Sequence, residues 1–143
     1  MTEPRLFTRD EAERTLPLVR RIVRDLMLEH PAWRRAVARY EVLAGTTRPG
    51  DAEAAELIAA QHDVEAHASR IEGYLGELQQ VGCVFKGFED GLVDFYSLRD
   101  DEPVFLCWQL GEPAVTHWHP LDEGFSARQP LAGVSYRPPP FVN

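Results

Sequence analysis

The chain has 143 residues, which suffice for one domain with a substantial core and are too few for two independent ones. Hydrophobic residues make up 44% and charged residues 27%, a balance typical of folded globular proteins rather than of disordered chains. The 15 Lys and Arg are outnumbered by 23 Asp and Glu, and the net charge of -8 opposes binding to the phosphate backbone of nucleic acids. We therefore expect a single domain over residues 1–143 that does not bind nucleic acid.

The sequence also lacks the features of membrane and nucleotide-binding proteins. No apolar run approaches the roughly 20 residues of a transmembrane helix, and the N-terminal residues have no apolar signal-peptide core. P-loop and GxGxxG motifs are absent. We expect a cytoplasmic protein, in which Cys83 and Cys107 are thiols unless they bind a metal.

The first half of the chain predicts a helical hairpin over about residues 8–81, and its first helix has a clear start. Thr8 and Glu11 have the spacing of a capping box. Side chains that form one helical face then recur at intervals of three and four residues. They are Leu16, Val19, Val23, Leu26, His30, Trp33, Val37 and Tyr40. Pro17 and Pro31 fall inside this pattern, and each is expected to kink or interrupt the helix.

A second helix is predicted after residues 45–50, which are rich in helix breakers and are followed by Asp51 as a plausible N-cap. Its apolar face ends near Gly82 and consists of Leu57, Gln61, Val64, Ala68, Ile71, Leu75 and Leu78. Two such helices joined by a short loop are expected to pack as an antiparallel pair. A lone pair buries too little surface, so the C-terminal segment, a second copy of the chain, or both are expected to cover it. We hypothesise a homodimer formed through the helices.

The histidines of the two helices predict a contact rather than a metal site. His30 is expected to lie near the level of His67 and Ala68 in the antiparallel pair. A polar contact at such a position often fixes the register of two helices. Neither helix carries the ExxH pairs of a carboxylate-bridged di-iron centre, so the sequence does not support that arrangement.

The second half of the chain predicts a small antiparallel β-sheet within about residues 83–119. Short β-branched and aromatic runs at 83–88, 93–98, 104–110 and 114–119 alternate with turn-like clusters at 89–91, 99–102 and 110–113. Pro113 has no amide to close a tight turn, so the register of the last two strands stays open. Residues 121–143 are expected to be loop-like, with an extended tail at Pro138 to Pro140. The expected fold class is α+β.

The candidate chemistry lies near His117 and His119. Two residues apart on a strand, both imidazoles would project from one face, with Trp118 on the other. Side chains able to complete a set of three or four metal ligands are Glu112, Asp94, Cys107 and Cys83. Imidazoles with carboxylates suit zinc, iron or manganese, whereas recruitment of the thiols favours zinc.

Structural interpretations of the same residues remain open. The two histidines can be half-buried polar residues at a sheet edge that hydrogen-bond to a carboxylate, and each cysteine can be a small buried hydrophobe. Arg128 can bind an anion, but an ordinary salt bridge with Glu112 or Asp94 is the simpler role. Catalysis by Cys107 as a nucleophile would need a lowered pKa and a positioned base, neither of which the sequence indicates.

A set of short motifs is spread over nearly the whole chain. It comprises Phe7-Thr8, Glu11-Ala12, Leu16-Pro17-Leu18-Val19, Lys86, Gly91-Leu92-Val93-Asp94-Phe95, Leu106-Cys107-Trp108, Gly111-Glu112, Trp118-His119 and Gly124-Phe125. In these motifs the chain resembles the prokaryotic family catalogued as domain of unknown function 2203, which has no known activity. The resemblance implies one compact domain and a family pattern that includes Asp94, Cys107, Glu112 and His119. His117 is less typical of that pattern, so the resemblance favours Glu112 with His119 as the core of any site.

Two hypotheses about function follow. The first is a metal-binding domain or small metalloenzyme with zinc, iron or manganese in the C-terminal β-region, held by Glu112 and His119 with His117, Asp94 or Cys107. The second is a non-catalytic homodimeric interaction module in which the tryptophans and histidines serve the fold. Neither hypothesis specifies a substrate.

Overall fold

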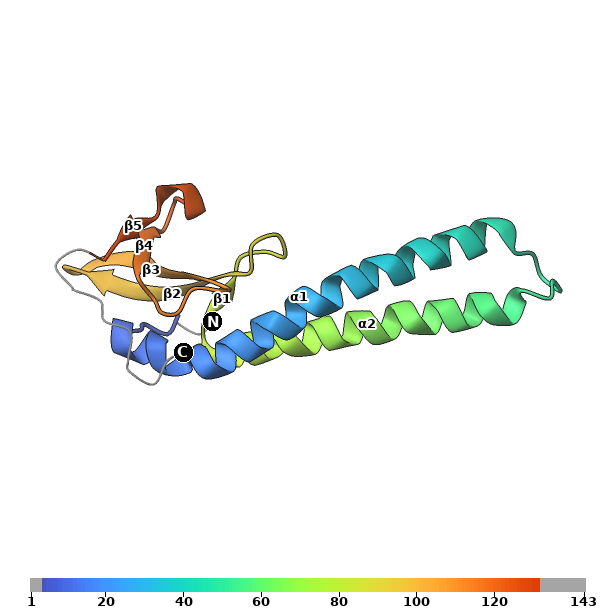
Figure 1. Ribbon diagram of the computed structural model, residues 1–143, viewed down its shortest axis with the longest axis horizontal. Helices are drawn as coiled ribbons and strands as arrows, with labels where there is room; N and C mark the ends of the chain where they lie inside the picture. Colours follow the sequence, from blue (N-terminus) through green and yellow to red (C-terminus); the bar gives the residue numbers. More distant parts are fainter. Residues whose placement is uncertain (1–3, 132–143) are drawn as a thin grey trace.

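The computed structural model of the chain describes residues 4–131, which form two long helices followed by a five-stranded antiparallel sheet (Figure 1). The helices α1 (Arg9–Thr46) and α2 (Ala54–Val81) lie side by side as an antiparallel pair. The sheet lies against one end of this pair, and the other end projects well beyond it. The α+β prediction is therefore confirmed.

The predicted start of α1 is confirmed in detail. The Thr8 hydroxyl accepts a hydrogen bond from the Glu11 amide at 3.1 Å, and the Glu11 carboxylate accepts one from the Thr8 amide at 2.9 Å. Of the two predicted effects of the prolines, a kink or an interruption, the interruption does not occur, because α1 continues through Pro17 and Pro31. Each proline removes one backbone hydrogen bond, but Leu16 and Val19 on either side of Pro17 are buried in the core, and this packing holds the turns together.

The loop between the helices differs from the prediction in its cap. The N-cap of α2 is Glu53, whereas the Asp51 carboxylate accepts a hydrogen bond from the Arg48 amide at 2.6 Å and so closes the loop. An Asp that bonds within its own turn is unavailable to the helix that follows. The helix α2 ends as predicted at Gly82, whose φ of 101° is the left-handed conformation that glycine adopts readily.

A polar contact sets the register of the two helices. The Glu29 carboxylate bonds to Nδ1 of His67 and accepts a hydrogen bond from Arg70 at 3.1 Å. The hydrogen bond with His67 is the main cause that holds the pKa of Glu29 below its usual value. The predicted level of His67 is therefore correct to within one residue, but His30 itself stacks on Phe88, with ring centroids 4.0 Å apart.

The sheet has the strand order β1-β2-β3-β4-β5. Its strands are β1 (Val84–Phe85), β2 (Leu92–Arg99), β3 (Glu102–Gln109), β4 (His117–Pro120) and β5 (Gln129–Pro130). The first and fourth strands are shorter than predicted, and β5 was not predicted, because two-residue strands are defined by their pairing with a neighbour rather than by a local pattern. A short 3₁₀ helix, η1 (Phe125–Ala127), precedes β5, so residues 121–131 are not simply loop-like. The predicted proline tail lies outside the described residues.

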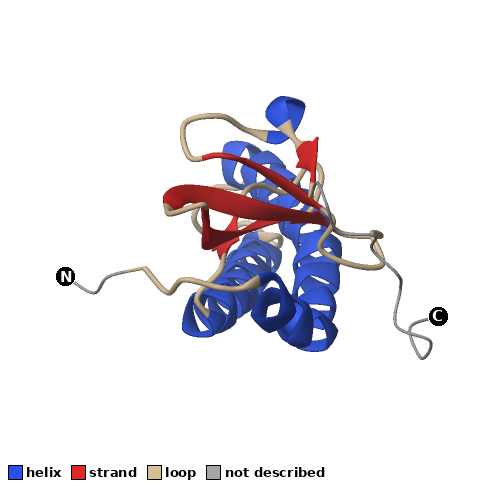
Figure 2. Ribbon diagram, turned by 90° about the vertical axis from the view of Figure 1, so that its left-hand side faces the viewer, coloured by secondary structure: helices blue, strands red, loops and turns tan. Residues whose placement is uncertain are grey.

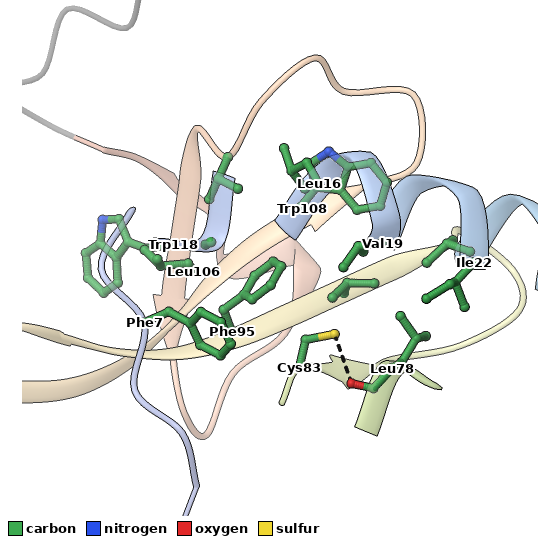
Figure 3. Close-up of a cluster of buried hydrophobic side chains, with 14 of the residues drawn as sticks. Phe7, Leu16, Val19, Ile22, Leu78, Cys83, Phe95, Leu106, Trp108 and Trp118 are labelled. Atoms are coloured by element: carbon green, nitrogen blue, oxygen red, sulfur yellow. Dashed lines mark hydrogen bonds between the residues drawn. The ribbon is translucent and has the colours of Figure 1, made fainter. Parts of the chain in front are cut away.

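The main core lies between the sheet and the base of the helices (Figures 2 and 3). Trp108 and Phe95 are fully buried there against residues of the first half of α1, such as Val19. The segment before α1 is tied to β2, because the Phe7 amide donates to Tyr96 O at 2.7 Å and the Ser97 hydroxyl donates to Phe7 O at 2.6 Å. One face of the sheet is thus buried against the helices.

The β2–β3 hairpin turns through two residues in the left-handed conformation. Asp100 and Asp101 have φ values of 51° and 65°, as a type I′ turn requires. We expect Asp101→Gly to raise the free energy of unfolding by about 0.5–1 kcal/mol, because glycine adopts positive φ without steric cost. Urea denaturation checks this result. Asp122→Gly, at an exposed aspartate without positive φ, should give no gain.

Candidate functional site

The face of the sheet turned away from the helices carries most of the predicted ligands. Val93, Leu106 and Trp118 lie in the core between the sheet and the helices. Because side chains alternate along a strand, the opposite face carries their sequence neighbours, among them Asp94, Cys107, His117 and His119. The prediction that both histidines share a face, with Trp118 on the other, is confirmed.

Three of these side chains form a compact group. The candidate ligand atoms of Asp94, Cys107 and His119 lie within 4.8 Å of one another. The residues are 2%, 1% and 2% exposed, so the group is shielded from water. They come from the adjacent strands β2, β3 and β4, whose register pairs Asp94 with Cys107 and sets His119 opposite Phe105. The sheet thus brings a carboxylate, a thiol and an imidazole together.

The contacts of its two ring nitrogens define the orientation of the His119 imidazole. Nδ1 lies 2.8 Å from the carbonyl oxygen of Pro120, which can only accept, so Nδ1 carries a proton and donates it. Nε2 lies 3.0 Å from Oδ2 of Asp94. The ring thus turns Nε2, rather than Nδ1, toward the carboxylate of Asp94. A hydrogen bond from Nδ1 to a carbonyl also orients many metal-bound histidines.

Asp94 has one carboxylate oxygen without a partner. Oδ2 contacts His119 and lies 3.9 Å from Nζ of Lys86. Oδ1 is buried and accepts no hydrogen bond from any described residue. A buried polar atom without a partner costs about 1–3 kcal/mol, and more when it carries charge. A carboxylate oxygen of Asp94 lies within 4.8 Å of the candidate ligand atoms of Cys107 and His119, so the three side chains could hold a cation.

Cys107 is not activated as a free nucleophile. Burial raises the pKa of its thiol to about 12, and the negative charge of Asp94 acts in the same direction. The Cys107 side chain is therefore a neutral thiol near pH 7, whereas nucleophilic catalysis needs a thiolate. Metal coordination would remove the proton, because a coordinating thiol is held as a thiolate. The second cysteine, Cys83, lies in the core and donates to Leu78 O at 3.5 Å (Figure 3).

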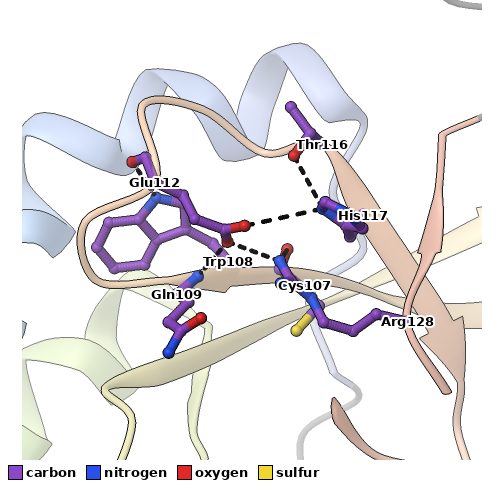
Figure 4. Close-up of polar contacts among 7 residues, drawn as sticks. All are labelled: Cys107, Trp108, Gln109, Glu112, Thr116, His117 and Arg128. Atoms are coloured by element: carbon purple, nitrogen blue, oxygen red, sulfur yellow. Dashed lines mark hydrogen bonds and ion pairs between the residues drawn. The ribbon is translucent and has the colours of Figure 1, made fainter. Parts of the chain in front are cut away.

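Glu112 and His117 belong to a neighbouring, half-buried cluster, which Arg128 links to Cys107 by donating to its carbonyl oxygen at 3.3 Å (Figure 4). Oε1 of Glu112 accepts hydrogen bonds from Arg128 and from the Gln109 amide, each at 2.6 Å. Nδ1 of His117 lies 3.8 Å from Oε2 of Glu112 and 2.9 Å from the Thr116 hydroxyl. Partial burial, and next the charge of Arg128, lower the pKa of His117.

The structure does not bring Glu112 to His119, contrary to the expectation from the resemblance. Glu112 lies in the connection between β3 and β4, where its carboxylate is bound by Arg128 and its carbonyl accepts from Trp108 Nε1 at 3.0 Å. The predicted salt bridge between Arg128 and Glu112 is confirmed. Glu112 thus stabilises the connection between β3 and β4, whereas the residues that lie beside His119 are Asp94 and Cys107.

Two further groups at the site were not predicted from the sequence. Lys86 places its ammonium 4.7 Å from the Phe105 ring centroid as well as near Asp94, and Pro120 supplies the carbonyl that orients His119. Lys86 stands among the motifs of the family resemblance, which is the one signal that marked it. A backbone carbonyl leaves no trace in the residue pattern, because every residue has one.

The fold and this group define an α+β protein whose sheet packs on a helical hairpin with one face and holds a buried Asp–Cys–His group on the other. The family model described as "Uncharacterized conserved protein (DUF2203)" matches residues 5–131, and the chain belongs to this family. The expectation from the sequence motifs is thereby confirmed. No curated protein and no solved structure matches the chain. Among the described residues, neither long helix combines the length and apolar character that a membrane span requires.

Proposed function

We propose that the chain is a metal-binding protein in which Asp94, Cys107 and His119 hold one divalent ion. The buried, unpartnered Oδ1 of Asp94 carries the proposal, because a cation bound by the group would supply the missing partner. The hydrogen bond from His119 Nδ1 to a carbonyl supports it, since this contact leaves Nε2 as the ligating nitrogen.

The ligand set favours zinc among the three metals considered. Thiolate and imidazole are preferred ligands of zinc, and zinc also accepts a carboxylate ligand. Manganese prefers oxygen ligands, so the thiol of Cys107 counts against it. Three protein ligands leave a fourth position on zinc, the arrangement of catalytic rather than closed structural sites, in which zinc activates a bound water. The three residues are only 1–2% exposed, so this fourth position is closed to a substrate in the described structure, and the proposal stops at metal binding.

Metal content tests the proposal directly. Untagged protein purified without chelators should contain about one zinc per chain by inductively coupled plasma mass spectrometry, and Cys107→Ser and His119→Gln should lose most of it. Loss of one of three ligands weakens binding strongly, because the remaining two cannot enclose the ion. Cys83→Ser and His117→Gln are matched controls, since they change the same residue types outside the group and should retain the metal.

Two results would count against the proposal. The first is substoichiometric metal in natively folded wild-type protein. The Asp94–His119 contact would then be a buried ion pair held by a hydrogen bond, without a metal. Equal metal loss in Cys83→Ser and Cys107→Ser would show that a general loss of structure, rather than loss of a ligand, releases the ion. Circular dichroism of each variant separates these two results.

A further inference from the structure

The distal part of the helical hairpin, residues 28–70, has almost no core of its own. The fully buried residues of α1 end at Leu26, and in α2 only Ala60 and Leu78 are fully buried. Trp33, Val37 and Leu57, which lie on the predicted apolar faces, remain half-buried. At the rise of an α-helix, α1 extends about 30 Å beyond Leu26, and Figure 1 shows this part projecting past the sheet.

Large apolar side chains are also exposed along this segment. Leu28, Val42 and Ile58 are 69%, 66% and 55% exposed. A two-helix pair of this kind is marginally stable in water, because most helical stability comes from packing an apolar face against other elements. The distal hairpin therefore needs a partner that the described residues of the chain do not supply.

Beyond the Glu29–Arg70 ion pair, the charges of the distal hairpin are separated between its two helices. Residues 31–46 of α1 carry Arg34, Arg35 and Arg39 and the single acid Glu41. Residues 54–66 of α2 carry acids and no Lys or Arg; these acids are Glu56, Asp63 and Glu65. Within residues 4–131, no ion pair joins the three arginines to the three acids, and all six side chains are exposed. One helix thus presents positive charge and the other negative charge to solvent.

We propose that a second copy of the chain covers the distal hairpin, with α1 of each copy beside α2 of the other. A two-fold axis makes such an interface self-complementary, because the basic helix of each copy meets the acidic helix of its partner and this contact occurs twice in the dimer. The four helices would then enclose the half-buried apolar faces in one bundle. A face about 30 Å long and two helices wide covers on the order of 600 Å² per copy, which is within reach of a standard interface.

Charge reversal tests this arrangement. The wild type should have twice its chain mass of 16.2 kDa by light scattering at micromolar concentration. The acidic variant (Arg34→Glu, Arg35→Glu, Arg39→Glu) and the basic variant (Glu56→Lys, Asp63→Lys, Glu65→Lys) should each be monomeric, because both helices then carry one sign of charge. Mixing the two variants should restore a 1:1 dimer, since each copy again meets its complement.

A matched control changes the charge by the same amount outside the hairpin. Glu102→Lys, Asp122→Lys and Glu123→Lys, all at exposed positions, should leave the dimer intact. A monomeric wild type would overturn the proposal, and so would two monomeric variants that fail to combine while retaining native circular dichroism. None of these measurements depends on metal, so the dimer and the metal site can fail independently.

Discussion

Replacing Trp108 with alanine should lower the free energy of unfolding by about 3–5 kcal/mol, the usual cost of removing a large aromatic side chain from a core. Trp108 is 0% exposed and packs in the cluster that joins the sheet to α1 (Figure 3). Its indole N–H also donates to Glu112 O at 3.0 Å, so the variant leaves that carbonyl without its partner. Because domains are typically stable by 5–15 kcal/mol, this loss is a large part of the total.

Urea denaturation followed by circular dichroism measures this effect. Trp108→Phe keeps most of the apolar volume and loses the hydrogen bond, so its cost should be less than half that of alanine. Phe125→Ala, at a side chain 44% exposed, should cost at most about 1 kcal/mol, which corresponds to its contact with Arg128. Equal costs at residues 108 and 125 would mean that Trp108 does not anchor the core.

The second large effect concerns the metal site and follows from the thiol of Cys107. The pKa of this group is raised to about 12 by burial, so the thiol is protonated throughout the neutral range. Zinc binds the thiolate, and each bound ion must therefore displace this proton. The apparent affinity for zinc should rise with pH, by about 100-fold between pH 6 and pH 8 from this one proton.

Competition with a chelating indicator at several pH values measures this dependence. The Cys107→Ser variant, which has no thiol to deprotonate at the site, should bind zinc weakly and with a shallower dependence on pH. Cys83→Ser should behave as the wild type, since its thiol lies in the core away from the group. An affinity that does not change with pH would exclude Cys107 as a thiolate ligand.

The proposed metal site and the proposed dimer depend on different parts of the fold. The buried Asp–Cys–His group depends on the register of β2, β3 and β4, whereas the proposed dimer depends on the distal helices. The Glu29–His67–Arg70 contact lies at the end of the distal hairpin nearest the sheet and fixes the relative positions of the helices. Changes to the distal charges are therefore expected to leave the metal site intact.

The sequence alone determined the features that depend on neighbouring residues. The capping box at Thr8 and Glu11, the spacing of apolar residues on both helices and the end of the second helix near Gly82 involve residues within a few positions of one another. The shared face of His117 and His119 follows in the same way from the alternation of side chains along a strand. The candidate list for the site accordingly included Asp94, Cys107 and His119.

Only the tertiary structure decided which candidates meet. His119 bonds to Asp94 across 25 residues of sequence, and Cys107 reaches both through strand register, which the sequence left open at Pro113. Glu112 is instead bound by Arg128, which lies 16 residues away in the sequence, at the end of the short helix η1. Long-range pairing depends on how whole elements pack, and a local residue pattern does not encode that packing.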